Sequence, residues 1–285
     1  MTLAAIILTK TSNSEILKTT LECAESLVKK ANTTTFDLSV IVVESDPAPV
    51  GHYPSWIRHI VINEPFNFHR FLNLGVKEAG HHDWYLLCNN DLLFDDNWLY
   101  EIEKVILKNK DIHSLSPISP TCREQQHHLK GALAGKDVVY GYTRRDQLSG
   151  WCLMISTHAL AQIGPLDERF QFYFADDDYA LCLRRHNIIH VLVPNSRVFH
   201  LEDKKMSKPN HKRTRTLPEK PSYLCHAKLR WITESEDMLA GFIEFQKKWG
   251  DYRIVAIKRK LHDFLFLRLG IKALSSALFR PIDRL

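Results

Sequence analysis

The sequence lacks the features that would place it in several large classes of protein. Its six cysteines include no C-x-x-C pair and no dense framework, so reduced cysteines in the cytosol are the simplest interpretation. No apolar run is long enough to cross a bilayer, and residues 1–8 contain neither a basic leader nor a cleavage site. There is no internal repeat and no low-complexity tract. We therefore expect a soluble or peripheral cytoplasmic protein.

Basic residues are unevenly distributed along this chain of 285 residues, whose formal net charge is +5. Nine Lys and Arg residues lie in 204–230 and eight in 253–284. Positive charge gathered at one end indicates an anionic partner, whether phosphate, membrane surface or nucleic acid. We predict no nucleic-acid partner, because the basic segments lack interleaved stacking aromatics.

The two basic segments differ in what else they contain. Residues 204–228 hold mainly Lys, Arg, Pro, Ser and Thr, and we expect either a loop that closes over a diphosphate or simply a solvated surface. Residues 254–285 mix apolar and basic residues, as does a helix that lies on an anionic membrane. Packing onto the rest of the protein, or dimerisation, would explain the same apolar residues.

Short apolar runs alternate with amphipathic segments over the first 110 residues. Buried strands are predicted at Leu3–Leu8, Leu38–Val43 and Tyr85–Cys88, and a helix capped by Ser14 is predicted after the first strand. The order strand, helix, strand favours a right-handed parallel unit whose strands end at one edge of the sheet. The sequence therefore predicts an α/β fold, in which ligands bind at that edge.

One apolar strand ends abruptly in Asn89, Asn90 and Asp91. Carboxylate and amide oxygens at a strand end suit Mg²⁺ or Mn²⁺ that carries phosphate oxygens. The same residues also suit a tight turn, and that alternative stays open. His200 ends a later strand, and its neutral imidazole could complete a metal site with Asp91 if the two strand ends meet.

A second acidic cluster, Asp176, Asp177 and Asp178, follows an aromatic stretch at 170–174 and precedes an apolar helix. Mutual repulsion and partial desolvation would raise the pKa of at least one carboxyl group, as a general base requires. The alternative is that one aspartate caps the helix and the others are solvated.

Several short motifs follow one another in the order and spacing of a known enzyme family. They are Val42-Val43-Glu44-Ser45, Pro65-Phe66-Asn67-Phe68 with Asn73-Leu74-Gly75, Leu87-Cys88-Asn89-Asn90-Asp91, Gly150-Trp151-Cys152-Leu153-Met154, Ile163-Gly164-Pro165-Leu166-Asp167-Glu168, Asp176 to Asp178, and Val198-Phe199-His200. On these motifs, the stretch from Leu3 to His200 resembles the inverting, nucleotide-sugar-dependent glycosyltransferases of the GT-A fold, in particular the bacterial family 2 that includes rhamnosyltransferases.

The resemblance implies a fold and a division of the chain. The fold would be α/β, with a GT-A (Rossmann-like) mixed, mostly parallel sheet flanked by helices and a C-terminal helical extension. Residues 1–203 would form the nucleotide-sugar-binding and catalytic domain, 204–228 a basic flexible loop, and 229–285 a basic amphipathic helical extension.

The resemblance also implies roles for individual residues. Asp91 and His200 would bind the metal, and Asp176 would act as the base, although a register slip of one residue would make Asp177 the base instead. The residues expected to bind the donor are Thr9, Glu44, Asn67, Asn73, Asn90 and Lys204.

The implied reaction is the transfer of a hexose or deoxyhexose from a nucleoside diphosphate sugar, with Mn²⁺ or Mg²⁺, to a hydroxyl of a glycan or lipid-linked acceptor in surface polysaccharide synthesis (capsule, O-antigen or lipopolysaccharide). Two alternatives stay open. A metal-dependent nucleotidyltransferase would also hold its metal on an aspartate at a sheet edge, although residues 9–13 contain no glycine. A non-catalytic binding module is suggested by Ala175 and Cys182, which depart from the family pattern.

Overall fold

The computed structural model describes residues 1–130, 137–201, 232 and 235–282. Lys204 and the rest of the loop predicted at 204–228 lie outside these residues. The lid role of that loop, and the domain boundaries on either side of it, therefore stay predictions.

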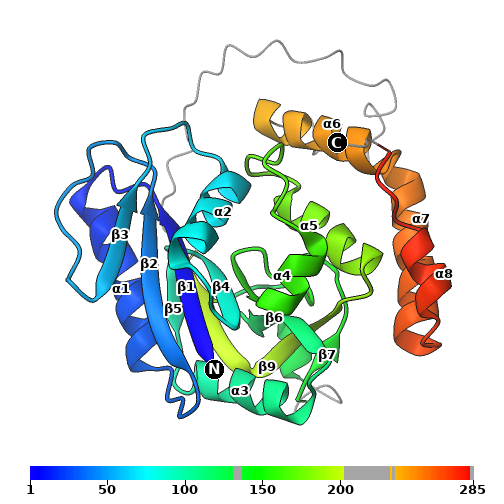
Figure 1. Ribbon diagram of the computed structural model, residues 1–285, viewed down its shortest axis with the longest axis horizontal. Helices are drawn as coiled ribbons and strands as arrows, with labels where there is room; N and C mark the ends of the chain where they lie inside the picture. Colours follow the sequence, from blue (N-terminus) through cyan, green and yellow to red (C-terminus); the bar gives the residue numbers. More distant parts are fainter. Residues whose placement is uncertain (131–136, 202–231, 233–234, 283–285) are drawn as a thin grey trace.

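The described chain forms one sheet with helices on both of its faces (Figure 1). The strands are β1 (Thr2–Thr9), β2 (Asp37–Glu44), β3 (Ile57–Val61), β4 (Trp84–Asn89), β5 (Leu92–Phe94), β6 (Ile112–Ile118), β7 (Val139–Tyr140), β8 (Cys152–Ser156) and β9 (Ile189–His200). The helices are α1 (Ser14–Lys29), α2 (Phe68–Ala79), α3 (Trp98–Lys108), α4 (Thr157–Ile163), α5 (Ala175–Arg185), α6 (Glu236–Trp249), α7 (Tyr252–His262) and α8 (Lys272–Ala277), with a 3₁₀ turn η1 (Gln126–Leu129) and a π-helical turn η5 (Asp263–Arg268).

The strand order is β3-β2-β1-β4-β8-β6-β9-β5, and β7 pairs with β9. Strands β3, β2, β1 and β4 are parallel neighbours, β8 runs antiparallel to both β4 and β6, and β5 runs antiparallel to β9. This arrangement confirms the predicted mixed, mostly parallel sheet flanked by helices. The three residues of β5 are too few to give a periodic signal, and the sequence did not predict this strand.

Burial on both faces explains why β1 lies inside the sheet. Leu3, Ala5 and Ile7 pack into a core shared with α1 and α3, whereas the alternate residues of the strand, Ala4 to Leu8, pack into a second core with α2, α4 and α5. A strand covered on both faces needs apolar residues at every position, which is the unbroken run seen in the sequence. Gly75 lets α2 approach closely, because a Cβ there would lie 2.4 Å from an Ile6 methyl group.

The C-terminal helices pack against α5 rather than against the strands (Figure 1). Phe174 and Leu181 share a third core with Phe242 and Phe245 of α6. Arg184 of α5 is almost fully buried and donates to both carboxylate oxygens of Asp263, at 3.1 and 3.0 Å. Among the helices of the described residues, none is both long and apolar enough to cross a membrane.

Candidate active site

The carboxyl ends of β1, β2 and β4 bring three predicted donor-binding residues to one edge of the sheet. Thr9 and Glu44 are opposite each other in the β1–β2 register, and Asn90 directly follows β4. The amide nitrogen of Asn90 donates to the hydroxyls of Thr9 (3.1 Å) and Thr20 (2.9 Å). The strand ends are therefore joined into one polar edge, as the parallel unit in the sequence predicts.

Glu44 is fully buried at this edge. Its Oε1 accepts hydrogen bonds from the backbone N–H groups of Thr11 (2.9 Å) and Asp46 (2.7 Å). Its Oε2 is also buried and accepts no hydrogen bond from the described residues. Because a buried carboxylate oxygen without a donor is costly, this atom is suited to accept a hydrogen bond from a ligand.

Asp91 and His200 meet although they are far apart in the sequence. Strands β5 and β9 pair antiparallel with Leu92 opposite His200, and the N–H of Leu201 donates to the Asp91 carbonyl at 3.0 Å. The His200 Nε2 atom lies 3.4 Å from Asp91 Oδ1, which is buried and accepts no hydrogen bond from the described residues. The indole of Trp151 stacks on the His200 ring with centroids 5.2 Å apart. The two side chains are thus held in a position that fits a divalent cation.

Two arginines from other parts of the chain contact the acidic first turn of α5. Arg259 of α7 donates to Asp177 Oδ1 at 2.8 Å, and the Nε atom of Arg144 lies 3.4 Å from Asp177 Oδ2. The same Arg144 nitrogen lies 3.8 Å from Asp176. Among the described residues, Asp177 therefore has two cationic partners, whereas Asp176 shares only the more distant one.

The surroundings of Asp176 raise its affinity for a proton. Burial and the neighbouring negative charge of Asp177 together raise the pKa of Asp176 to about 6, against the opposing effect of Arg144. Such a carboxylate is ionised at pH 7 but takes up a proton more readily than an ordinary aspartate. Gly150, just before β8, leaves room for it, because a Cβ at that position would lie 2.8 Å from the Asp176 Cβ.

The third acid of the cluster, Asp178, has a structural role. It is almost fully buried, accepts a hydrogen bond from the Trp249 indole (2.7 Å) and lies 2.8 Å from the Lys248 ammonium group. Lys248 also contacts Asp167 at 2.9 Å, so these charges join α5 and the preceding turn to α6. The alternative in which an aspartate caps α5 is wrong, because Phe174 occupies the N-cap position.

Asn67 and Asn73 bind the protein's own backbone. Asn67 caps α2 by accepting a hydrogen bond from the Arg70 N–H (3.1 Å), and its amide nitrogen donates to the Glu168 carbonyl (2.7 Å). Asn73 accepts from the Leu166 N–H (2.9 Å) and donates to the Leu166 carbonyl (2.8 Å). Both amides therefore hold one turn against α2, and their predicted contact with the donor stays a prediction.

Sequence reasoning did not identify the contacts of Arg144, Arg259 and Trp151. The two arginines lie outside every motif, and their partners on α5 are distant in the sequence. Trp151 belongs to the motif at 150–154, but nothing in that motif indicates that its ring stacks on His200. Only the folded chain brings these residues to the site.

No protein family model and no curated protein matches the chain, whereas many solved structures share its fold. The mannosyltransferase PcManGT from Pyrobaculum calidifontis, solved with GDP-Man and Mn²⁺, is 12% identical, and the match covers 97% of this chain and 83% of that one, with a TM-score of 0.52. The chain has the GT-A fold. Residues 1–349 of TarS from S. aureus give 13% identity and a TM-score of 0.51, over 70% of this chain and 60% of that one. GalNAc-T7, solved with UDP, GalNAc and Mn²⁺, is 11% identical with a TM-score of 0.51, and the match covers 70% of this chain and 44% of that one.

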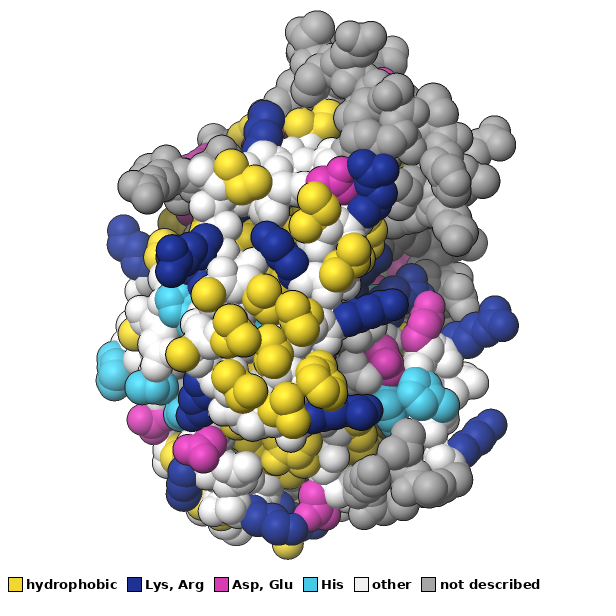
Figure 2. Space-filling view, turned by 90° about the vertical axis from the view of Figure 1, so that its right-hand side faces the viewer, with side chains coloured by type: hydrophobic (Ala, Val, Ile, Leu, Met, Phe, Trp, Pro, Cys, Tyr) yellow, Lys and Arg dark blue, Asp and Glu magenta, His cyan; other side chains and the backbone are white. Residues whose placement is uncertain are grey.

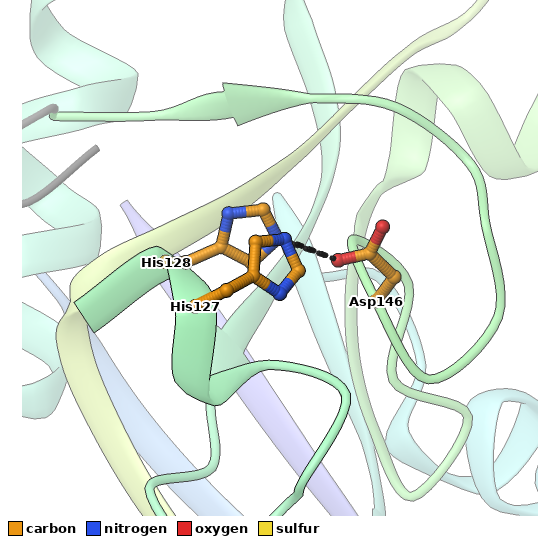
Figure 3. Close-up of side chains that lie close together, drawn as sticks. All are labelled: His127, His128 and Asp146. Atoms are coloured by element: carbon orange, nitrogen blue, oxygen red, sulfur yellow. Dashed lines mark hydrogen bonds and ion pairs between the residues drawn. The ribbon is translucent and has the colours of Figure 1, made fainter. Parts of the chain in front are cut away.

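A second cluster of metal-binding residue types lies between β6 and β8 of the GT-A fold (Figure 3). His127 and His128 lie in η1, and their Nε2 atoms are 3.5 and 2.5 Å from Asp146 Oδ1. The sequence did not predict this cluster. Because His128 is hydrogen-bonded directly to Asp146, which also accepts from the Gln147 amide (2.6 Å), the cluster is explained as a contact between two loops.

Proposed function

We propose that the protein is a metal-dependent, inverting glycosyltransferase that uses a nucleoside diphosphate sugar. The observation that carries this proposal is the Asp91 and His200 pair at the sheet edge, with a buried carboxylate oxygen that accepts no hydrogen bond from the described residues. Burying such an oxygen costs free energy unless a cation or a hydrogen-bond donor contacts it. The GT-A fold raises the expectation of this reaction class by analogy.

The donor would lie along the edge formed by β1, β2 and β4. The buried Oε2 of Glu44 offers an acceptor for an N–H group of the nucleotide base, and the hydrogen-bonded side chains of Thr9 and Asn90 line the same strand ends. We propose that the diphosphate lies between these residues and the Asp91 and His200 pair. Lys204, which lies outside the described residues, is proposed to approach the diphosphate from the basic loop.

Mn²⁺ or Mg²⁺, held by Asp91 and His200, would neutralise charge that develops on the diphosphate leaving group. The rest of the chemistry belongs to the protein's own side chains. Asp176 accepts the proton of the acceptor hydroxyl as that oxygen bonds to the anomeric carbon and the bond from this carbon to the diphosphate breaks. One displacement from the opposite face inverts the configuration. Asp177, paired with two arginines, is the less suitable base because its charge is already compensated.

We propose that the acceptor is a glycan or lipid-linked glycan, that the sugar is a hexose or deoxyhexose, and that the reaction belongs to surface polysaccharide synthesis. The location that fits this role is the cytoplasmic face of the inner membrane, with the protein bound peripherally. These proposals rest on the resemblance in the motifs and on the basic C-terminal segment.

The test is donor binding and slow donor hydrolysis across a panel of uridine, guanosine and thymidine diphosphate sugars, with and without Mn²⁺. We expect one donor to bind only when the metal is present. His200→Asn should weaken this binding by about 10- to 100-fold. The matched control is His127→Asn, which alters an exposed histidine of the other cluster and should leave donor binding unchanged.

Three other results would contradict the proposed function or favour one of its alternatives. If no nucleoside diphosphate sugar shows metal-dependent binding, the proposed function is wrong. Transfer of a nucleotidyl group to a sugar phosphate in the same panel would favour the nucleotidyltransferase alternative. Donor binding without hydrolysis or transfer to any acceptor would favour a binding module.

A further inference from the structure

An exposed apolar face runs along α7, η5 and α8. Ile254, Ile257, Leu261 and Phe264 follow one another at intervals of three and four residues, which places them on one side of the helix. They are 44 to 68% exposed, and Ile271, which precedes α8, and Leu274, which lies in it, are 42 and 55% exposed. Figure 2 shows these helices from outside, with apolar side chains gathered in the middle of the face. We call this surface the α7–α8 face.

Charge on and around the α7–α8 face is mostly positive. Residues 252–282 contain seven Lys and Arg residues, of which Arg259 points inward to Asp177 and Arg253 pairs with Asp251 at the start of α7. The one acid in this range, Asp263, is paired with the buried Arg184. Lys260, Arg268 and Lys272 are exposed. In Figure 2, dark blue Lys and Arg side chains border the apolar patch on several sides, and a few magenta acidic side chains lie near its upper right and lower left. An apolar centre with a basic rim matches the acyl and headgroup layers of an anionic bilayer.

The opposite side of these helices is fixed to the protein. Val255, Phe266 and Phe279 are buried in the cores shared with α5, and Arg259 reaches Asp177. The exposed apolar residues therefore lie on the side of these helices that faces away from the core. The buried side holds the helices in place, so the exposed side is a permanent part of the surface.

We propose that the α7–α8 face docks on an anionic membrane surface. A second copy of the chain fits less well, because a two-fold contact would set two basic rims against each other. An acidic protein would satisfy the rim but not the six apolar side chains at the centre. The lipid-linked acceptor rests on the proposed function, whereas docking rests on the surface alone.

Docking would also orient the candidate active site. Arg259 lies two residues from both Ile257 and Leu261, so it projects from the other side of α7, toward Asp177. One short helix therefore contacts the proposed membrane with one side and the acidic cluster with the other. The candidate active site would then lie at a fixed distance from the bilayer surface, where a membrane-bound acceptor could reach it.

Co-sedimentation with vesicles tests the proposal on the full chain. We expect binding to phosphatidylglycerol and phosphatidylethanolamine vesicles and little to pure phosphatidylcholine, with affinity that falls as salt rises. Arg268→Glu with Lys272→Glu should lower the partition coefficient about 30-fold or more, from about fivefold for each basic residue lost. The control Lys77→Glu with Lys110→Glu makes the same charge change on exposed residues elsewhere and should bind as the unaltered chain does.

A second variant, Ile257→Asp with Leu274→Asp, places two carboxylates within the apolar centre and should also abolish binding while the circular dichroism spectrum and melting transition are kept. Removing 254–285 is a poorer test, because it would take away Arg259 and Asp263. The proposal is overturned if the unaltered chain does not bind anionic vesicles, if neither variant weakens binding, or if the face instead forms a dimer that the second variant dissociates. Donor hydrolysis, measured separately without vesicles, should be unchanged in both variants, so failure of docking and failure of the proposed function are distinguishable.

Discussion

Replacing Asp176 by asparagine should make the folded protein more stable while it removes activity. Burial and Asp177 raise the pKa of Asp176 from its ordinary value of 3.8 to about 6. Ionising this carboxyl group in the folded protein therefore costs about 3 kcal/mol more than in the unfolded chain. The asparagine keeps an oxygen that can accept the hydrogen bond from the Asp177 N–H and carries no charge to desolvate.

The sign of this stability change follows from the pH at which the folded and the unfolded protein each take up the proton. Below pH 3.8 the carboxyl is protonated in both states, so the asparagine changes little. Between about pH 4 and pH 6 the unfolded chain ionises first, and the stability that the protonated group contributes is progressively lost. Above pH 6 the loss is complete. Asp176→Asn should thus raise the free energy of unfolding by up to about 3 kcal/mol at pH 8 and by about half of that at pH 5.

Urea denaturation at the two pH values, with a chelator present, measures this difference. Asp37→Asn, which replaces an exposed carboxylate on β2, controls for the loss of one negative charge. The same Asp176→Asn preparation should bind the donor and transfer no sugar. The reasoning is refuted if the variant is no more stable than the unaltered protein at pH 8, or if its effect is equal at both pH values.

Three other predictions follow from the surroundings of Asp176. The acidic limb of the pH profile of kcat/KM should lie near pH 6. Asp177→Asn should move this limb to lower pH, because Asp176 loses a neighbouring negative charge. A limb that does not move would argue against an electrostatic interaction between Asp176 and Asp177. Gly150→Ala should lower kcat more than donor affinity, since its Cβ would displace Asp176, and an unchanged kcat would contradict this. Lys248→Met should destabilise the protein by about 3–5 kcal/mol in a thermal or urea melt, because it leaves the buried Asp178 carboxylate without its cation, and a loss below 1 kcal/mol would exclude that role.

The sequence predicts the fold where burial imposes a pattern on it. The apolar run of β1 and its neighbours, and the polar residues after each strand, are sufficient to place Thr9, Glu44 and Asn90 at one edge. The direction of β8 is not encoded in any such pattern, because an antiparallel strand buried on both faces has the same composition as a parallel one.

The candidate site was predictable where local motifs carry it and unpredictable where distant parts of the chain meet. Asp91 and His200 were expected to meet, and β5 and β9 bring them together. Three adjacent aspartates in a sequence do not indicate which of Asp176 and Asp177 is the proposed base. The two differ in their surroundings because of Arg144 and Arg259, which reach α5 from separate parts of the chain.

The pairing of β5 with β9 also has a consequence for how the protein is made. Asp91 and His200 are 109 residues apart, and His200 ends the last strand of the described sheet. A nascent chain that has reached only β5 presents Asp91 alone, which is a weak ligand for a divalent ion. At the proposed metal site, high affinity would arise only when β9 has been synthesised and has paired with β5 across the helices and strands between them. A bound ion would thus indicate that the sheet is complete, because a chain that stalls or misfolds before residue 200 would lack one of the two proposed ligands.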